Sequence, residues 1–148
     1  MKKILMLLII MFFVIFLSCC NNKNIKEEDD IMNKELILKI NDNEVDVNWE
    51  NNESINSLKN IINDELIINM NKYGGFEQVG SIGKSLPSKD IRITTEPGDI
   101  VLYSSNNIVI FYGSNTWKYT KLGHINLSKD ELEKLLSKDN VLIKFELK

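Results

Sequence analysis

The chain has 148 residues, of which 43% are hydrophobic and 26% are charged, so it is long enough for one globular domain with a sizeable core. Its formal net charge is −3, and an acidic protein is poorly suited to the phosphate backbone of a nucleic acid. We therefore expect a single folded domain with no nucleic-acid partner.

The N-terminus has the pattern of a secretory signal peptide. Lys2 and Lys3 precede an uninterrupted apolar run over residues 4–17, and the small residue Ser18 follows. A basic start, an apolar core of this length and a small residue before the cleavage site are typical of such peptides, whereas a membrane-spanning helix needs about 20 apolar residues. We predict that residues 1–18 are a signal peptide, with an uncleaved membrane anchor as the alternative.

The end of this segment, Phe16-Leu17-Ser18-Cys19, resembles the lipobox of bacterial lipoproteins, in which a cysteine after a small residue receives a diacylglycerol group. The resemblance implies that Cys19 is lipidated. It also implies that a membrane lipid anchors the protein on the extracytoplasmic side of the bacterial cell envelope. Cys20 stays open as the acceptor, because Leu17 would then stand three residues before it. Two incidental cysteines in a secreted chain are a further alternative.

Residues 19–34 are predicted to be a flexible tether. From Asn21 onward this segment consists mainly of Asn, Lys, Glu and Asp, which cannot bury enough apolar surface to offset the entropy of ordering. Its four adjacent acidic residues, 27–30, lack the alternating ligands and the turn glycine of a calcium loop, so we interpret them as a solvated charge block. No cysteine follows Cys20, so we expect no disulfide framework.

Residues 35–148 are predicted to form the folded domain. Extended segments are expected at 36–40, 44–49, 65–70, 76–82, 100–103, 108–112, 116–122 and 141–147, with short helices that begin at Ser54 and at Ser128. The order shows neither a regular alternation of strand and helix nor a repeat. Such an order favours a closed β-barrel capped by its helices.

The runs Ile100–Tyr103 and Ile108–Tyr112 are predicted to pair as antiparallel strands at the centre of the domain. Both are rich in β-branched and aromatic residues, and a polar break separates them, as is typical of neighbouring strands. Neither run alternates between apolar and polar residues. This indicates strands that are covered on both faces, or a barrel wall with helices against its outside.

The second helix has the best-defined start. Ser128 and Glu131 have the spacing of a capping box, in which each side chain bonds to the backbone of the other residue. Leu127 and Leu132 are placed to form the accompanying hydrophobic staple. For the first helix, Ser54 is the predicted N-cap.

Four segments, in their order and spacing, resemble the small bacterial cyclophilin-like domain family: Gly83–Pro87, Thr94–Ile100, Asn107–Tyr112 and Tyr119–Ile125. The likeness covers about residue 35 to the end of the chain. It implies a mainly β domain built as a closed eight-stranded barrel with two short helices, the fold of the prolyl isomerases. In this family the domain is also found on lipoproteins.

The resemblance in fold does not carry isomerase activity with it. True cyclophilins place a catalytic arginine in a Phe-His-Arg strand motif, and this triplet is absent from the sequence. No isomerase residue is therefore transferred, and the sequence assigns no catalytic residue.

Arg92 and His124 are the only arginine and the only histidine of the chain. A planar guanidinium suits two-pronged recognition of a carboxylate or phosphate, so Arg92 is a candidate binding residue. The alternative is that Arg92 merely survives in a chain biased toward Lys, Asn and Ile, on a solvent-exposed barrel face, since Ile91 and Ile93 flank it in alternation. His124 is either a rim residue at a strand end or a ligand contact and general base. One histidine excludes a histidine-rich metal centre within a single chain, and we expect neither a metal nor a cofactor.

Tyr103 and Tyr112 are candidate binding residues as well. Together with Tyr73, Trp117 and Tyr119, they could line a groove beside the barrel. Aromatic residues at strand spacing are more often part of the core and the barrel wall, and that alternative stays open.

These observations favour a surface-tethered, monomeric binding module that holds a peptide or small ligand without chemistry. The first alternative is an extracytoplasmic prolyl isomerase or chaperone with rearranged residues. The second is an enzyme of unknown reaction, but the sequence shows no clustered acid and base that would indicate one.

Overall fold

The structure, a computed structural model, describes residues 30–148. The predicted signal peptide and both candidate lipidation sites, Cys19 and Cys20, lie outside the described residues, as does most of the predicted tether. Residues 30–33 are helical, and Glu35–Lys148 form one compact unit. In the part of the chain that is described, no helix is long and apolar enough to cross a membrane.

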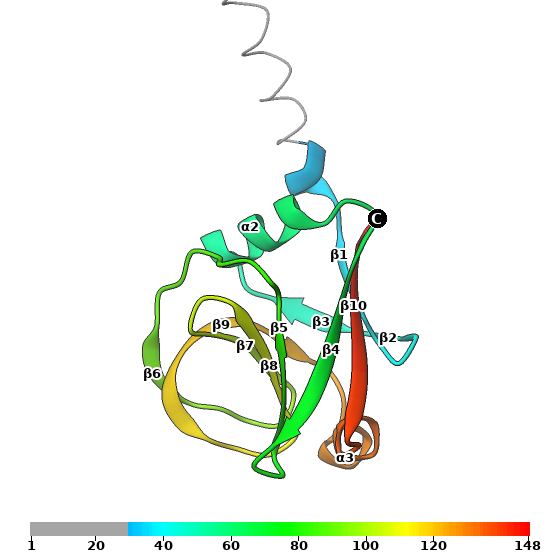
Figure 1. The fold of residues 1–148 in the computed structure, drawn as a ribbon, viewed down its shortest axis with the longest axis vertical. Coiled ribbons are helices and arrows are strands. Elements are labelled where there is room, and N and C mark those ends of the chain that lie inside the picture. Colours follow the sequence, from blue (N-terminus) through cyan, green and yellow to red (C-terminus); the bar gives the residue numbers. More distant parts are fainter. Residues whose placement is uncertain (1–29) are drawn as a thin grey trace, which may run out of the picture. The chain divides into compact units, whose positions relative to one another are not determined.

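The compact unit is mainly β, as predicted, and its strands pair in antiparallel fashion. The described residues form ten strands: β1 (Leu36–Ile40), β2 (Asn43–Val45), β3 (Val47–Trp49), β4 (Glu65–Tyr73), β5 (Glu77–Ser81), β6 (Ile91–Thr94), β7 (Asp99–Tyr103), β8 (Asn107–Phe111), β9 (Thr116–Ile125) and β10 (Asn140–Leu147). Helices α2 (Glu53–Ile61) and α3 (Lys129–Leu136) accompany them. Figure 1 shows their arrangement.

The two ends of the sheet meet in one kinked strand, which closes the barrel. The strand order is β2-β1-β10-β4-β5-β8-β7-β9-β3, and β6 pairs with β9 off this path. β2 and β3 follow each other with only Asp46 between them, so the sheet returns to its start (Figure 1). With β2 and β3 counted as one kinked strand, the ring has the eight strands that the family resemblance implied.

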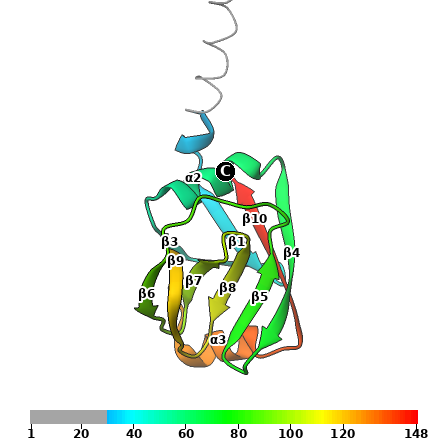
Figure 2. The ribbon, with the colours of Figure 1, turned by 60° about the vertical axis from the view of Figure 1, so that its left-hand side comes forward.

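The two helices cover opposite ends of the barrel (Figures 1 and 2). Ile55 and Leu58 of α2, and Leu132 and Leu136 of α3, are buried in the same core cluster as the inward-facing strand residues such as Phe145. Each large apolar side chain contributes about 1.5–3 kcal/mol to folding stability when it is fully buried. Both helices therefore stabilise the barrel by packing against a single core at its two ends.

The capping box that begins α3 is confirmed. The Ser128 hydroxyl accepts from the backbone N–H of Glu131, and the Glu131 carboxylate accepts from the backbone N–H of Ser128 at 2.9 Å. These two bonds satisfy N–H groups that the first turn of a helix leaves without intrahelical partners.

The predicted cap of α2 was wrong. Asn52 is the N-cap, and its side-chain oxygen accepts from the backbone N–H of Ile55 at 3.0 Å. Ser54 is buried instead, and its hydroxyl donates to the carbonyl of Pro87 at 2.6 Å. Its hydroxyl is thus used to hold the loop that leads into β6.

β7 and β8 form the predicted antiparallel pair and are covered on both faces. Their inward side chains belong to the main core. Outside the barrel, Val101 and Val109 pack with Phe111 and Tyr119 in a second, smaller cluster, against which Ile93 of β6 also packs. Aromatic side chains and strand β6 therefore cover the outer face of the pair. Of the two expectations, coverage on both faces is confirmed, and a helix against the outside is not what covers these strands.

Two strands differ from the prediction. β6 was not predicted, and it pairs with the first half of β9. β9 was expected to end at Leu122 but continues to Ile125. It continues because β3 pairs with its last residues, and a Cβ on Gly123 would come within 2.9 Å of the carbonyl oxygen of Asn48, so this glycine lets the two backbones lie close together.

Candidate functional site

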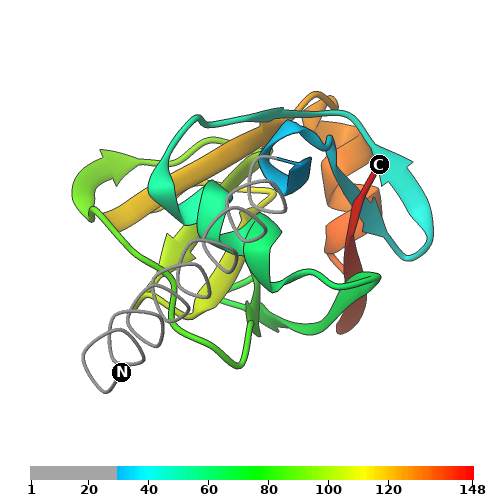
Figure 3. The ribbon, with the colours of Figure 1, turned by 90° about the horizontal axis from the view of Figure 1, so that it is seen from above.

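β9 is shared between the barrel wall and a projecting pair of strands. Its residues from Thr120 to His124 pair with β7, whereas residues 116–119 pair with β6. We call the latter pair, residues 91–94 and 116–119, the flap. Seen from above, the yellow-green β6 and the amber first half of β9 extend beyond the barrel on one side (Figure 3).

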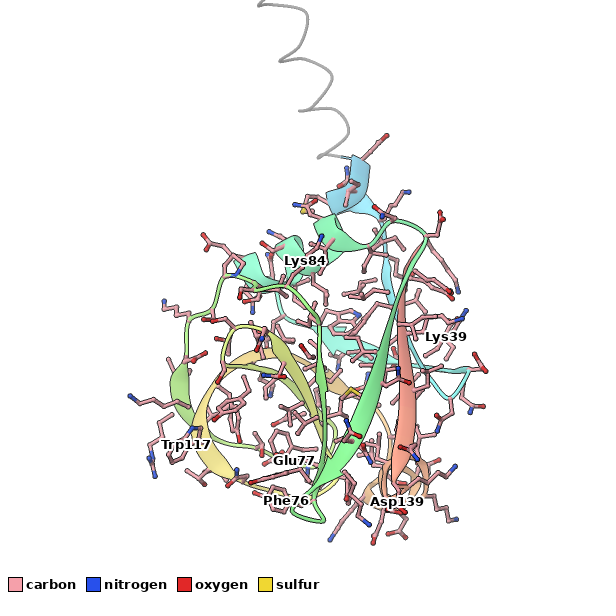
Figure 4. The ribbon with its side chains drawn as sticks, in the orientation of Figure 1. Lys39, Phe76, Glu77, Lys84, Trp117 and Asp139 are labelled. Carbon is pink, nitrogen blue, oxygen red and sulfur yellow. The ribbon has the colours of Figure 1, made fainter. Side chains whose placement is uncertain are left out.

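A groove of about 380 Å³ lies between the flap and the outer face of the barrel wall. Its lining residues are Tyr73, Glu77, Val79, Tyr103, Val109, Asn115, Trp117 and Tyr119. They come from β4, β5, β7, β8, the loop before β9 and the flap. Figure 4 shows Trp117 on the flap and Glu77, next to Phe76, at the start of β5. A mainly apolar hollow with a few polar groups is the usual form of a ligand site.

Aromatic rings fix the walls of the groove through edge contacts. The ring of Tyr119 meets those of Tyr103 and Phe111 at centroid distances of 5.9 and 5.6 Å, both at an interplanar angle of 67°, which is a favoured arrangement. Asn115 donates to the Tyr119 hydroxyl at 3.0 Å. These contacts fix the orientation of Tyr119 beside Glu77.

Glu77 is the charged group of this groove. Side chains alternate along β5, and Gln78 points into the barrel, so Glu77 points outward, opposite Phe111 of β8. Only 6% of Glu77 is exposed, and its Oε2 has no hydrogen-bond partner among the described residues. Burial raises the pKa of the Glu77 carboxyl to about 7.

Gln78 fixes the position of β5 from the other face. It is fully buried, and its amide nitrogen donates to the carbonyls of Leu136 at 2.6 Å and Lys138 at 2.7 Å. These carbonyls lie at the C-terminal end of α3, where a helix has no further N–H groups to offer. The two hydrogen bonds from Gln78 thus join the C-terminal end of α3 to β5, the strand that carries Glu77.

A second hollow, of about 590 Å³, lies where the start of α2 meets β9 and the loop before β6. Several polar groups around it already have partners within the protein. Thr120 accepts from the backbone N–H of Lys89 at 2.8 Å and donates to Asp90 at 2.7 Å, and Asn52 donates to the carbonyl of Lys121 at 2.9 Å. The groove with the unpaired Glu77 is therefore the stronger candidate site.

Residues 38–146 match the Cyclophilin-like family. The chain belongs to this family. A comparison with curated proteins finds no matching relative. The match spans every strand of the barrel except the first residues of β1 and the last of β10, so the family resemblance that the sequence suggested is confirmed.

Four of the five aromatic side chains considered from the sequence line the groove of this cyclophilin-like domain. They are Tyr73, Tyr103, Trp117 and Tyr119. Tyr112 does not: it is 5% exposed and belongs to the main core. The reason is strand alternation, because Phe111 faces the outer cluster and its neighbour consequently faces inward.

Arg92 lies on the flap but does not line the groove. It pairs in register with Lys118, while its neighbour Ile93 packs against the outer cluster. Because successive side chains point to opposite faces of a strand, Arg92 faces away from the groove. A role for Arg92 in binding a ligand at this site has no support from its position.

His124 belongs to an ionic cluster outside the groove. Its Nδ1 lies 2.8 Å from Asp99 Oδ1, and Lys121 Nζ lies 3.1 Å from the same oxygen. Asp99 Oδ2 accepts from the backbone N–H of Glu96 at 3.0 Å. Burial acts to raise the pKa of Asp99, but the hydrogen bonds from His124, from the Glu96 backbone and from Lys121 lower it below its usual value. The cluster ties β7 to β9 beside the flap.

Sequence reasoning missed Glu77 and Asn115. The signal for Glu77 was present, since a charged residue stands between Phe76 and the extended run that follows. Its meaning depends on which face of β5 turns toward the barrel, and that follows from pairing with β8, 30 residues further on in the chain. Asn115 lies outside the regular strands, where local patterns carry little information.

Proposed function

We propose that this chain is a lipid-anchored binding module of the bacterial cell envelope, facing the extracytoplasmic side, and that its cyclophilin-like domain holds a peptide or small ligand in the groove beside the flap. The observation that carries the proposal is Glu77, a 94%-buried carboxyl without a partner for Oε2 in the described structure, set among exposed aromatic rings. Gln78 Oε1 and the Tyr112 hydroxyl are also buried without a partner in the described residues, but Glu77 is the one of the three that lines the groove, and an ionisable group with a strongly shifted pKa in a cleft is a candidate for ligand binding.

The distribution of exposed apolar side chains supports the same site. The described residues include five large hydrophobic side chains that are exposed: Ile67, Tyr73, Ile91, Tyr103 and Trp117. Three of these five line the groove. Clusters of exposed aromatic residues, unlike scattered ones, are typical of binding surfaces.

The location is inferred from the N-terminal sequence. Residues 1–18 have the signal-peptide pattern and Cys19 follows a small residue, with Cys20 as the alternative acceptor. A diacylated cysteine carries two chains, and two chains give stable anchoring where one gives marginal anchoring. The polar segment that follows would place the domain at a distance from the membrane surface.

The binding proposal is tested by a screen of capped tetrapeptides against the full chain, read by tryptophan fluorescence and followed by calorimetry of the hits. We expect saturable binding that Tyr103→Ala weakens about tenfold, or about 1.4 kcal/mol, as is typical of an aromatic contact residue. Ile67→Ala, which shortens an exposed apolar side chain outside the groove, is the matched control and should leave the affinity unchanged. No binding at all, or hits that Tyr103→Ala does not affect, would contradict the proposal.

Prolyl isomerase activity is the alternative, and the position of Arg92 argues against it. Rotation about a prolyl bond has a barrier of about 18–20 kcal/mol, and lowering it electrostatically requires a donor aimed at the rotating amide. We expect no acceleration of isomerisation of acetyl-Ala-Phe-Pro-Ala-amide. Acceleration that disappears in Arg92→Ala would make Arg92 catalytic, and acceleration that persists in this variant would mean that other donors perform the reaction.

A further inference from the structure

The groove contains one carboxyl group and no base. Of the residues described as lining it, Glu77 is the only carboxylic acid, and none is a lysine, an arginine or a histidine. Lys121, two residues after Tyr119, forms an ion pair with Asp99, with 3.1 Å between Nζ and Oδ1. Lys118 shares the outer face of the flap with Arg92. The negative charge of Glu77 thus has no counter-ion on the groove side.

Resting on the proposed function, we infer that the ligand of the groove carries an organic ammonium group, which Glu77 binds as its counter-ion between the aromatic walls. The carboxyl supplies the charge, and the strand that carries it, β5, is held from the barrel side by the two hydrogen bonds of the neighbouring residue Gln78. A charge-assisted hydrogen bond from an ammonium group to a carboxylate is stronger than one between neutral groups.

The aromatic walls favour a cation over other ligands that could bond to a carboxyl. The faces of Trp and Tyr rings carry negative charge density and attract a cation that lies within about 6 Å of the ring centroid. Tyr73, Tyr103, Trp117 and Tyr119 all line the groove. A hydroxyl or amide donor could bond to Glu77 equally well, but it would gain nothing from these rings.

The charge of Glu77 depends on pH, and so must the affinity. The titratable groups that line the groove beside it are Tyr73, Tyr103 and Tyr119, and burial followed by the charge of Glu77 raises the pKa of Tyr119. On the inner side of the wall, burial, then the charges of Glu133 and Glu77, raise the pKa of Tyr112. The raised pKa values keep Tyr119 and Tyr112 neutral between pH 6 and pH 8, so the charge that changes beside them is that of Glu77.

The size of the effect follows from this titration. A carboxyl with a pKa of about 7 is roughly one-tenth ionised at pH 6 and roughly nine-tenths ionised at pH 8. An alkylammonium ion stays charged across this range. Its affinity should therefore rise about tenfold from pH 6 to pH 8, while the affinity of a neutral ligand should not rise.

The experiment uses the full chain in detergent and two pairs of probes, with binding measured by calorimetry at pH 6 and pH 8. The first pair is butylammonium and the neutral 1-butanol. The second pair is acetyl-lysine-amide and its Nε-acetylated derivative, which has no charge. If butylammonium binds, an alkylammonium group alone is sufficient for recognition. If only acetyl-lysine-amide binds, the site recognises a lysine side chain in a peptide.

We expect each cation that binds to do so about tenfold more tightly than its neutral partner at pH 8. Glu77→Gln, which keeps the shape of the side chain, should abolish this preference and the pH dependence. Glu50→Gln, the same substitution at the second hollow, should change neither. Should Glu77→Gln not fold, the wild-type carboxyl is titrated by carbon NMR with and without butylammonium, whose binding must lower the pKa of Glu77.

The outcomes separate the two proposals. Equal affinities of the cationic and neutral probes, or a preference that survives in Glu77→Gln, would overturn the cation inference and leave the binding module standing. If no probe binds while capped tetrapeptides without amines do, only the cation inference fails. If neither probes nor peptides bind, both proposals fail.

Discussion

Glu77 ionises less readily in the folded protein than in the unfolded chain, because folding removes its carboxyl from water. Burial raises its pKa from the ordinary 4.5 to about 7. Between these pH values the unfolded chain has released the proton and the folded protein still holds it. The free energy of unfolding therefore falls as the pH rises through this window, by up to about 3 kcal/mol.

Glu77→Gln should remove this cost. We expect the variant to be more stable than the wild type at pH 8 by up to about 3 kcal/mol, since a neutral amide replaces a buried charge. Near pH 4.5 the two proteins should have similar stabilities, because the wild-type carboxyl is then protonated. Urea unfolding at both pH values measures the difference, with Glu50→Gln as the control. Parallel pH profiles of wild type and Glu77→Gln would show that this carboxyl is not the group that titrates.

Asp99 has the opposite linkage. Its folded-state pKa lies below the usual value, so the stabilisation from its cluster is present at neutral pH and is lost as the pH falls through that lowered pKa. We expect Asp99→Asn to reduce the free energy of unfolding at pH 7 by about 1–3 kcal/mol, since His124 and Lys121 lose a charged partner. The deficit should shrink in acid. Asp64→Asn, at an exposed position, should have no such effect at either pH.

At the scale of elements, Gly80 sets how closely β5 can approach β4. A Cβ at Gly80 would lie 2.5 Å from the sulfur of Met70 and 2.9 Å from the backbone oxygen of Asn69. The backbone oxygen cannot move without shifting β4. We expect Gly80→Ala to cost about 1–3 kcal/mol of stability through overpacking, measured by urea unfolding. Ser85→Ala, in the exposed loop after β5, is the control, and an equal effect of the two would mean that β4 and β5 are not tightly packed here.

The elements that sequence patterns predicted best are those whose partners are near in the chain. β7 and β8 are linked by a short polar turn, and both were read from two apolar runs. The start of α3 depends on two residues three positions apart. β6 was not among the predicted strands although Ile91 and Ile93 alternate around Arg92, because its four residues pair with β9, more than twenty residues further on, and so short a pattern does not report its partner.

The groove could be predicted in part for the same reason. Its aromatic side chains, such as Tyr103 and Trp117, stood out by residue type alone. The assignment of Tyr112 to the groove was wrong because successive side chains of a strand point to opposite faces. The strand register is needed to decide whether Phe111 or Tyr112 points outward. The role of Glu77 could be predicted only from the register of β5 with β8 and from the pairing of β6 with β9 that forms the flap.

At the scale of the whole molecule, the lipid anchor is a prediction about the N-terminal cysteines. Metabolic labelling with a fatty acid should mark the wild type and spare Cys19→Ser, because the acceptor cysteine is the site of acylation. Cys20→Ser is the matched control and should label normally. Labelling lost in Cys20→Ser alone would move the site by one residue, and labelling of both variants would exclude the lipoprotein interpretation.

The domain offers two indole N–H groups as reporters of where a ligand binds. Trp117 lines the groove and is 53% exposed. Trp49 lies elsewhere, and its indole nitrogen donates to the carbonyl of Leu36 at 2.7 Å. The two signals of a proton–nitrogen NMR spectrum therefore distinguish the groove from the rest of the domain.

The most direct test of the ligand site is to follow both indole signals while a hit from the peptide screen is added. We expect the Trp117 signal to shift in proportion to occupancy, together with the backbone amides of Val79 and Tyr103, while the Trp49 signal stays in place. A titration that shifts residues of the second hollow, such as Ser88 and Lys89, and leaves Trp117 unchanged would contradict the assignment of the groove as the binding site.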